Sequence, residues 1–269
     1  MKLSIIITNY QSYQHLLICL TSIKRFLYSD KSLKNNFEVI IVNNDKKEIT
    51  VPFSQYPFVS QKIINTKQNI GFGLANNLGS IMAKGDYLLF LNPDTVFTDN
   101  SLKKALDYLD KNKEVGILGL KIIDHHRKTP QNWTCGHKTT WGTILFRNTI
   151  NKPWNKKSPQ TVQWVSGTAL LIRRKIFNQI GRFDKNFFMY FEDQDLCLRV
   201  RQKGYKIVFF PYSQIIHFNG RSWRNQKEKQ KRAYRESQIY FFKKHNSRLG
   251  HLLLKSIYFL LSFLNKNRK

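Results

Sequence analysis

The chain has 269 residues, of which 41% are hydrophobic, and this suffices for a buried core in one large domain or two small ones. Its formal net charge of +28 favours a polyanionic partner such as a nucleic acid, an anionic membrane face or a phosphorylated substrate. The 3 cysteines are odd in number and far apart, which excludes a disulfide framework or a zinc knuckle and fits a reducing compartment. The apolar run Leu3–Ile7 is too short for the core of a signal peptide, so we expect none.

Strand-like and helix-like segments alternate in the first hundred or so residues, a pattern typical of βαβ units around a mostly parallel sheet. Apolar periodicity predicts strands at Leu3–Thr8, Phe37–Val42, Gln61–Ile64 and Tyr87–Leu91, and helices at His15–Tyr28, Leu74–Ala83 and Ser101–Lys111. Ligands of such sheets bind beyond the carboxyl ends of the strands. Three polar clusters begin at those ends, namely Thr8-Asn9-Tyr10, Asn43-Asn44-Asp45 and Asn92-Pro93-Asp94.

The second half is less regular. We expect strands at Val115–Ile123, Val162–Ile172, Lys206–Phe210 and Gln214–Phe218, and a strongly basic helix at Arg224–Asn246. A long loop region rich in Pro and Trp separates the first two of these strands, and long loops in compact domains are usually functional. We find no internal repeat and no sharp boundary. The expected organisation is one domain in two halves, 1–112 and 113–223, followed by a basic helix and amphipathic tail at 224–269.

The most apolar stretch of the chain is Leu249–Leu264, which is shorter than the ~20 residues needed to span a bilayer. His251 and Lys255 interrupt it. We therefore expect no membrane-spanning helix and predict that this segment lies in a membrane interface. A terminal helix that packs its apolar face on the protein itself is the alternative, and the sequence leaves both open.

Three carboxylates, Glu192, Asp193 and Asp195, directly follow the aromatic run Phe187–Phe191. Burial against aromatic rings disfavours the ionised form of a carboxylate, so such clusters usually serve proton transfer, metal binding or helix capping. Acidic residues are also common in the first turn of a helix, and the cluster by itself supports either interpretation.

Asp94 stands at the exit of a very apolar strand, where Pro93 ends the strand ladder. A lone Asp in this position is most often a turn former. The segment Asn69-Ile-Gly-Phe-Gly places Gly71 and Gly73 between a strand and a helix, where backbone N–H groups can face an anion. Because position 76 is Asn, the pattern is not Gly-x-Gly-x-x-Gly, which argues against a dinucleotide-binding dehydrogenase.

Eight motifs in a fixed order resemble those of family 2 glycosyltransferases, and more narrowly of the rhamnosyltransferase-like branch. They are Ile5-Ile-Ile-Thr-Asn-Tyr, Glu38-Val-Ile-Ile-Val-Asn-Asn, Asn69-Ile-Gly-Phe-Gly, Leu91-Asn-Pro-Asp, Val165-Ser-Gly-Thr-Ala-Leu-Leu-Ile-Arg-Arg, Gly181-Arg-Phe-Asp, Phe187-Phe-Met-Tyr-Phe-Glu-Asp-Gln-Asp-Leu and His217. The resemblance implies a GT-A fold, that is, a Rossmann-like α/β nucleotide-diphospho-sugar transferase fold with a mostly parallel central sheet flanked by helices. It also implies a nucleotide sugar donor, Mn²⁺ or Mg²⁺, and inversion at the anomeric carbon.

The same resemblance implies roles for single residues. Asp94 matches the last acidic residue of the family's Asp-x-Asp metal motif, and His217 matches a histidine that completes the metal shell in some relatives. Asp193 matches the catalytic base, with Glu192 beside it. The implied donor-binding residues are Thr8, Asn9, Asn43, Asn44, Asn69, Gly71, Gly73 and Asn92. Asp195, Tyr190 and Gly167 are assigned to the acceptor site or to supporting positions.

The chemistry of sugar transfer agrees with these roles. A divalent ion held by oxygen and imidazole ligands stabilises the charge that develops on the leaving phosphates. A carboxylate must take the proton of the attacking acceptor hydroxyl, and we expect N–H groups at a helix start to keep Asp193 ionised for this task. Further candidates for phosphate contacts, none of them assigned, are Arg173, Arg174, Arg221 and Arg224.

The leading hypothesis is a metal-dependent inverting glycosyltransferase at the cytoplasmic membrane face. It would add a sugar, with rhamnose favoured by the resemblance, to a saccharide or lipid-linked saccharide of the cell surface, and an anionic membrane would explain the basic second half. A nucleic-acid-binding protein is the first alternative, but the chain lacks the sequence signatures of one, and we expect no nucleic-acid partner. A non-catalytic saccharide-binding relative is the second, against which the intact Asp94, Asp193 and His217 count.

Overall fold

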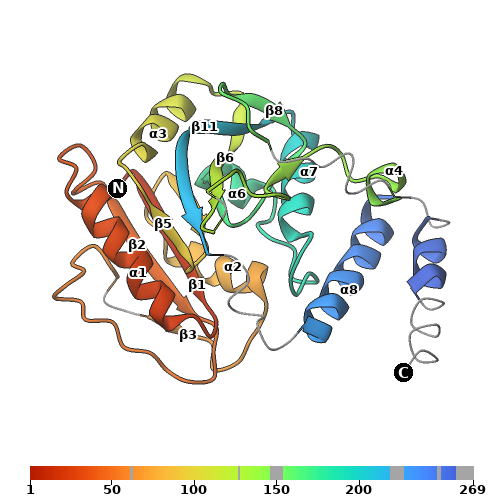
Figure 1. Ribbon diagram of the computed structural model, residues 1–269, viewed down its shortest axis with the longest axis horizontal. Coiled ribbons are helices and arrows are strands. Elements are labelled where there is room, and N and C mark those ends of the chain that lie inside the picture. The colour runs from red at the N-terminus through yellow and green to blue at the C-terminus, as the bar shows by residue number, and fades with distance from the viewer. Residues whose placement is uncertain (61–62, 127, 146–153, 219–226, 247–249, 259–269) are drawn as a thin grey trace.

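The computed structural model describes residues 1–60, 63–126, 128–145, 154–218, 227–246 and 250–258. Its elements in chain order are β1 (Leu3–Asn9), α1 (Tyr13–Ile23), the π-helical η1 (Lys24–Tyr28), β2 (Phe37–Asn43), β3 (Ile64–Asn65), α2 (Phe72–Met82), β4 (Tyr87–Leu91), β5 (Thr95–Phe97), α3 (Leu102–Lys111), β6 (Val115–Asp124), β7 (Cys135–Gly136), α4 (Trp141–Leu145), β8 (Gln160–Val162), β9 (Trp164–Val165), β10 (Ala169–Arg173), α6 (Arg174–Gln179), α7 (Glu192–Gln202), β11 (Lys206–His217) and α8 (Lys227–His245). Residues 250–258 form a further helix. Figure 1 shows α1 and α8 at opposite sides of the molecule.

A 9-stranded sheet forms the centre, in the order β3-β2-β1-β4-β10-β6-β11-β5, with β8 also paired to β11. Strands β3, β2, β1 and β4 pair in parallel, as do β6 and β11. β10 is antiparallel to both β4 and β6, and β5 and β8 are antiparallel to β11. Most strands therefore point one way, which confirms the mostly parallel sheet. Because β10 lies between β4 and β6, both halves of the chain build one continuous sheet.

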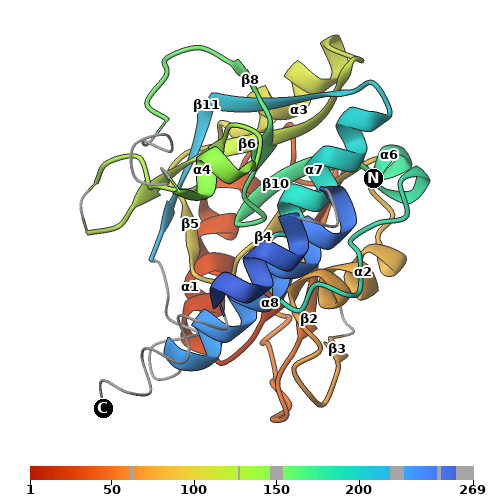
Figure 2. The same ribbon diagram turned by 90° about the vertical axis from the view of Figure 1, so that its right-hand side faces the viewer.

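Helices cover both faces of this sheet, as Figures 1 and 2 show. Alternate residues of a strand point to opposite faces, so Ile5 and Ile7 of β1 join one apolar cluster and Ile6 joins the other. The first cluster includes buried residues of α1 and α3, and the second includes residues of α2, α6 and α7. The near-continuous apolar composition of the inner strands follows from burial on both sides.

A third apolar cluster holds the C-terminal helices to the domain. It consists of Phe187, Phe191, Phe241, Phe242 and Leu254. Residues 187 and 191 precede α7, residues 241 and 242 belong to α8, and residue 254 lies in the helix 250–258. The last helices are thus packed against the segment that carries the predicted carboxylate cluster.

Several expected elements differ in their boundaries. The strand predicted at Val162–Ile172 is divided into β8, β9 and β10, and the two strands predicted near the end form the single β11, with an irregularity between Phe210 and Gln214. Strands β5 and β7 were not predicted, since each owes its strand character to one tertiary partner, β11 and β9 respectively. Of the predicted strand and helix ends, residues 61–62 and 224–226 lie outside the described residues.

The described part of the predicted membrane segment is packed on the protein through one side chain, and its binding to a membrane stays a prediction. Leu254 is buried in the third cluster, whereas Leu252 and Leu253 are 57% and 56% exposed. Positions 249 and 259–264 of that segment lie outside the described residues. Within the ranges that the structure describes, no helix is both long and apolar enough to cross a membrane.

Candidate active site

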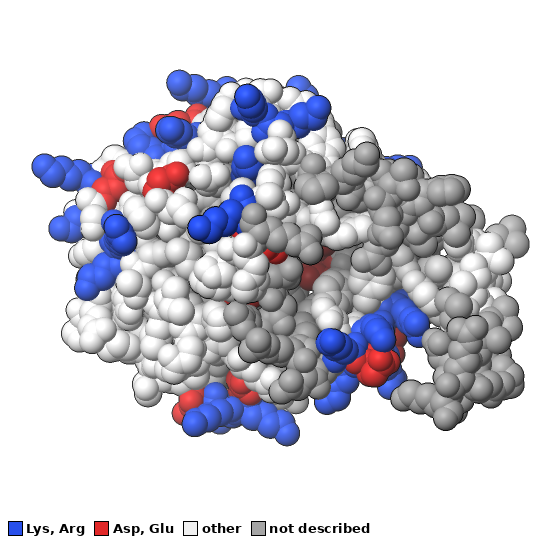
Figure 3. Space-filling view, viewed as in Figure 1, with Lys and Arg blue, Asp and Glu red and all other residues white. Residues whose placement is uncertain are grey.

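A cavity of about 1340 Å³ opens where strands of the central sheet end, and Thr8, Asn44, Asn92, Asp94 and His217 are among its lining residues. These residues follow or end β1, β2, β4 and β11. The position agrees with the general rule for α/β sheets. Figure 3 shows acidic side chains recessed in a hollow of the surface, while Lys and Arg stand out in scattered groups, many of them near the outline of this view.

Asp94 and His217 meet at one end of the cavity. β5 pairs with the end of β11 so that Thr95 lies opposite His217, and this register brings Asp94 beside the imidazole ring. The Nε2 atom of His217 is 3.1 Å from Oδ1 of Asp94, and both side chains are largely buried. The backbone N–H of Phe218 donates to the carbonyl of Asp94 at 2.9 Å, which fixes the two chain segments to each other.

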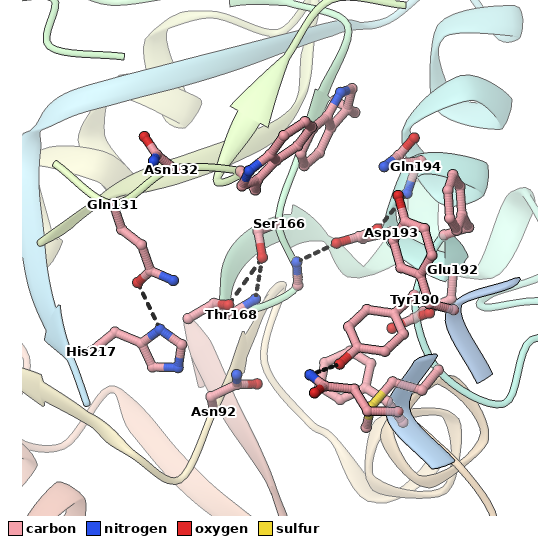
Figure 4. A pocket seen from close by; sticks show the side chains of 18 of the residues that line it. Asn92, Gln131, Asn132, Ser166, Thr168, Tyr190, Glu192, Asp193, Gln194 and His217 are labelled. Atoms are coloured by element: carbon pink, nitrogen blue, oxygen red, sulfur yellow. Dashed lines mark hydrogen bonds between the residues drawn. The ribbon is translucent and has the colours of Figure 1, made fainter. Parts of the chain in front are cut away.

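Gln131 orients the imidazole from behind. Its Oε1 atom is 2.8 Å from Nδ1 of His217, and Figure 4 shows the pair on one side of the cavity. A metal-bound histidine almost always places its second ring nitrogen against an oxygen acceptor, which leaves the other nitrogen free for the ion. The arrangement of Asp94, His217 and Gln131 therefore fits a divalent cation. The part of the chain that the structure describes holds no group of three or more His, Cys, Asp or Glu that could bind a metal.

Glu192 and Asp193 lie on the opposite side of the cavity, at the start of α7 (Figure 4). Tyr190 and Phe191, just before the helix, have left-handed backbone angles of φ 71° and φ 66°, which turn the chain sharply into α7. The carboxylate of Asp193 accepts N–H bonds from Gly167 at 3.0 Å and from Gln194 at 2.8 Å. Both of its oxygens are therefore held in a fixed orientation.

The two carboxyl groups differ in their tendency to ionise. Burial raises the pKa of Glu192 well above its ordinary value, and the charge of Asp193 raises it further. One oxygen of Glu192 is buried without a hydrogen-bond partner. Burial also raises the pKa of Asp193, and the N–H bonds of Gly167 and Gln194 lower it by less. The expectation that helix N–H groups keep this pKa low is corrected: the hydrogen bonds exist, but burial outweighs them.

Asp195 belongs to a separate buried ion cluster and does not line the cavity. Its oxygens are 2.7 Å from Nη2 of Arg199, 2.6 Å from Nζ of Lys244 and 2.7 Å from Nε2 of His245. Burial raises the pKa of Asp195, but the contacts of His245, Arg199 and Lys244 outweigh burial and lower it to about 2. Asp195 thus joins α7 to α8. This favours the supporting position over the acceptor-site position that the sequence left open for it.

The predicted donor residues divide into two groups. Thr8, Asn44, Asn69 and Asn92 line the cavity, whereas Asn9 and Asn43 do not. Asn9 donates to Asn43 at 3.0 Å, and Asn43 donates to the carbonyl of Lys47 and to Asn65. These amides tie the ends of β1, β2 and β3 together, and a direct contact with the donor stays a prediction for them.

The glycines of the predicted phosphate loop serve close packing. Gly71 has φ 90°, and a Cβ atom there would collide with the carbonyl oxygen of Phe188; at Gly73 it would lie 3.1 Å from Cβ of Phe183. The N–H of Phe72 donates to that same Phe188 carbonyl at 2.9 Å. Neither glycine lines the cavity, and their assignment to the donor stays a prediction. They let the start of α2 pack against the segment that leads into α7.

Gly167 and Tyr190 were assigned to the acceptor site or to supporting positions, and this assignment stays a prediction. Both line the cavity, and the N–H of Gly167 binds the carboxylate of Asp193. Of the arginine candidates, Arg173 donates to the Tyr87 hydroxyl and the Val115 carbonyl at the opposite end of the sheet, which excludes it from the site. Arg174 does not line the cavity either, and Arg221 and Arg224 lie outside the described residues.

Sequence reasoning missed two groups of cavity residues. One lies in the loop after β6, where Gln131 and Trp133 are brought over the sheet by the pairing of β7 with β9. The other is one face of α8, made of Gln230, Lys231, Tyr234, Arg235 and Gln238. Their spacing of about one helical turn indicates that they share one face of a helix. Only the packing shows that this face, and not another, lines the cavity.

Comparisons with known proteins place this geometry among glycosyltransferases. The sequence model of glycosyl transferase family 2 matches residues 4–181. An N-acetylglucosaminyl-diphospho-decaprenol L-rhamnosyltransferase of Mycobacterium tuberculosis is 27% identical over 227 residues, covering 74% of this chain and 73% of the relative. Rhamnosyltransferase WbbL of Escherichia coli K12 is 26% identical over 213 residues, which cover 73% of this chain and 78% of the relative.

Solved structures share the fold at low sequence identity. A mannosyltransferase from Pyrobaculum calidifontis, PcManGT with GDP-Man and Mn²⁺, has a TM-score of 0.61 at 13% identity and covers 90% of this chain and 63% of its own. GalNAc-T7 with UDP, GalNAc and Mn²⁺ has a TM-score of 0.60 at 16% identity and covers 81% of this chain, which spans less than half of that protein (44%). These likenesses confirm the expected GT-A fold.

Proposed function

Because the chain belongs to glycosyl transferase family 2, we propose that it is an inverting hexosyltransferase that moves a sugar from a nucleotide diphosphate sugar to a saccharide acceptor. One observation carries the proposal. His217 faces the Glu192–Asp193 pair across one cavity, and Asp94, beside His217, lines the same cavity. Its volume of about 1340 Å³ exceeds the ~300–1,000 Å³ of ordinary ligand pockets and leaves room for a donor and an acceptor together.

Asp94 and His217 would hold Mn²⁺ or Mg²⁺ at the donor end. A divalent ion there supplies charge stabilisation to the departing diphosphate. Gln131 keeps the Nε2 atom of His217 directed at Asp94, and the cavity-lining Thr8, Asn69 and Asn92 are the proposed donor contacts.

Asp193 is the proposed general base at the other end. Its two N–H partners fix the carboxylate so that a lone pair can face the acceptor hydroxyl. Glu192 has the more strongly raised pKa and therefore holds a proton more readily, which leaves Asp193 as the ionised partner of the pair. Two adjacent carboxyl groups whose environments raise their pKa values to different extents suit a division into a neutral and an ionised partner.

For the acceptor we propose a lipid-linked saccharide of cell-surface polysaccharide synthesis, and for the sugar rhamnose. The relative that acts on N-acetylglucosaminyl-diphospho-decaprenol supports this choice. We further propose that the protein acts as a peripheral protein at the cytoplasmic membrane face, supported by the exposed Leu252, Leu253 and Ile257 beside the exposed Lys255. The nucleic-acid alternative is not favoured, because acidic groups line the cavity.

The function is tested by a screen of nucleotide sugars for thermal stabilisation in Mn²⁺ or Mg²⁺. A specific ligand at 100 times its Kd adds ~2.7 kcal/mol to the free energy of unfolding. The proposal requires that one nucleotide sugar stabilises the protein and that EDTA removes the effect. If no nucleotide sugar stabilises the protein in either metal, the proposed donor class is wrong.

The location is tested by deleting residues 249–269. The shortened protein should no longer sediment with anionic vesicles, and it should still hydrolyse the donor. If it sediments with vesicles as well as the full chain does, the tail is not the anchor. If it unfolds instead, packing of Leu254 in the third cluster is the main role of the tail.

A further inference from the structure

One face of α8 forms a wall of the cavity beside the carboxylate pair. Its residues Gln230, Tyr234 and Gln238 lie at successive turns, as do Lys231 and Arg235. Gln230 donates to the hydroxyl of Tyr190 at 2.6 Å, and the Tyr234 ring is 5.6 Å from the Tyr190 ring. This contact places the α8 face at the Glu192 and Asp193 end rather than at the metal end.

Arg235 is the distinctive cation of this face. It is half-buried, and its guanidinium carbon lies 5.2 Å from the ring centroid of Tyr258. Within the described residues no carboxylate pairs with it. The other arginines nearby are neutralised: Arg199 by Asp195 and Arg232 by Glu236. Lys231 also lines the cavity but is 61% exposed and pairs with Glu228. A half-buried arginine without a counter-ion, in the wall of a cavity, is available to a bound anion.

The carboxylate pair makes such a cation necessary for one class of acceptor. An acceptor that carries phosphate groups is repelled by an ionised Asp193, and its binding requires a positive group on the same side of the cavity. A guanidinium matches the oxygens of a phosphate with two parallel N–H bonds and stays charged at every relevant pH. A neutral saccharide acceptor gains nothing from this group.

We propose that Arg235, with Lys231 beside it, binds the diphosphate of a lipid-linked acceptor and so holds the first sugar against Asp193. The proposal rests on the proposed function for its meaning, since it names the acceptor class of that site. Three neighbouring features of the protein support it. Asp193 and Arg235 line the same cavity, and Tyr258, the ring partner of Arg235, belongs to the helix whose Leu252 and Leu253 are exposed. A lipid-linked saccharide presents the matching groups, namely a sugar, a diphosphate and an apolar prenyl chain.

The test measures binding rather than turnover. The full-length protein, with Mg²⁺ and saturating UDP or dTDP to occupy the donor end, is titrated calorimetrically with farnesyl diphosphate, inorganic pyrophosphate and farnesol. We expect farnesyl diphosphate to bind the native protein and Arg235→Ala to weaken this binding at least tenfold. Arg235→Lys should recover part of the loss, since it restores the charge without the planar fork. Pyrophosphate should bind more weakly than farnesyl diphosphate and show the same sensitivity to Arg235→Ala.

Arg232→Ala is the matched control, because Arg232 lies one turn away on the same helix, is 81% exposed, pairs with Glu236 and does not line the cavity. It should bind farnesyl diphosphate within twofold of the native protein. Equal losses in both variants would reduce the effect to surface charge and overturn the proposal. Three other results would also overturn it: native affinity for farnesyl diphosphate in Arg235→Ala, no binding of farnesyl diphosphate by the native protein, or binding of farnesol as tight as that of farnesyl diphosphate. If the protein binds no nucleotide but Arg235→Ala still weakens the binding of farnesyl diphosphate, the proposed function is wrong and the diphosphate site at Arg235 stands.

Discussion

At the donor end of the cavity the functional side chains follow strands of one sheet, whereas at the acceptor end they come from two helices and a tight turn. Asp94 and His217 are positioned by backbone pairing of β5 with β11. Asp193 depends on the left-handed turn at Tyr190 and Phe191, and α8 is attached to α7 through Asp195. The donor end is therefore set by the sheet itself, and the acceptor end by side-chain packing and ion pairs that can be removed one at a time.

The largest effect on activity should come from Asp193→Asn. The amide cannot take the acceptor proton, so transfer should fall by ~10²–10⁴ while donor affinity stays native. Because the pKa of Asp193 is raised, native transfer should decline on acidification at a higher pH than an ordinary aspartate would give. Single-turnover transfer rates over a pH series, with calorimetric donor binding, check both expectations.

Glu192→Gln is the control for that variant. Glu192 is proposed to be neutral in the working enzyme, and glutamine is a neutral side chain of nearly the same shape, so most transfer should remain. If Glu192→Gln abolishes transfer while Asp193→Asn keeps it, the base has been misassigned within the pair. If both variants stay fully active, neither carboxylate is the base.

The donor end should respond to Asp94→Ala and His217→Ala. Replacing the partner behind a metal ligand typically costs about 10- to 100-fold in metal affinity, and loss of the ligand Asp94 should cost at least as much in metal-dependent donor binding. His217→Ala should cost less, since water can replace one ligand. Calorimetric titration of donor nucleotide with and without EDTA measures this. Native donor binding in Asp94→Ala, or a native protein indifferent to EDTA, would remove the metal role.

The attachment of α8 should fail with Asp195→Asn. Breaking a buried ion cluster on one side leaves Arg199 without its carboxylate partner and removes the contacts of Asp195 with Lys244 and His245, which typically costs ~3–5 kcal/mol of unfolding free energy. The acceptor end should be lost first, while nucleotide binding at the donor end persists. Denaturant unfolding followed by Trp fluorescence measures the cost. Asp184→Asn, which shares Lys244 but is partly exposed, should cost less.

The same cluster predicts a pH dependence of stability. Asp195 has its pKa lowered from 3.8 to about 2, so its contribution is fully present above the ordinary value. That contribution is lost as the pH falls from about 4 towards 2. The native protein should therefore lose stability more steeply in this window than Asp195→Asn does. Parallel acid titrations of the two proteins would contradict the ionised state of the cluster.

The smallest effect is expected from replacing Gly71, which lets the start of α2 pack against Phe188 in the segment before α7. Gly71→Ala and Gly204→Ala both force a left-handed backbone on alanine, at φ 90° and φ 87°, which costs ~1–2 kcal/mol each. A Cβ at Gly204 meets nothing within 4 Å, whereas one at Gly71 collides with Phe188. Gly71→Ala should thus lose more stability than Gly204→Ala by chemical denaturation. Equal losses would show that the packing at Gly71 tolerates a methyl group.

Much of the fold was readable because its signals are local. The apolar runs of β1, β2 and β4 predict buried strands, and the polar residues that follow them predict the ligand edge of the sheet. Asp94, Asp193 and His217 were found through ordered motifs, and the structure places all three in one cavity. The π-helical end of the first helix and the division of the strand predicted after residue 162 were not readable, since both are set by neighbours in space.

The order of residues is enough to show which segments are buried strands, where polar groups follow them, and that carboxylates stand behind an aromatic run. Which of those polar groups face the cavity depends on long-range packing. Asn9 and Asn43 have the same local context as Asn44, yet they bond to each other inside the sheet edge. Asp193 and Asp195 are two residues apart on one helix, and that spacing turns one towards the cavity and the other towards α8. Local sequence sets backbone conformation and burial, but the role of a polar side chain depends on the partner that long-range packing brings to it.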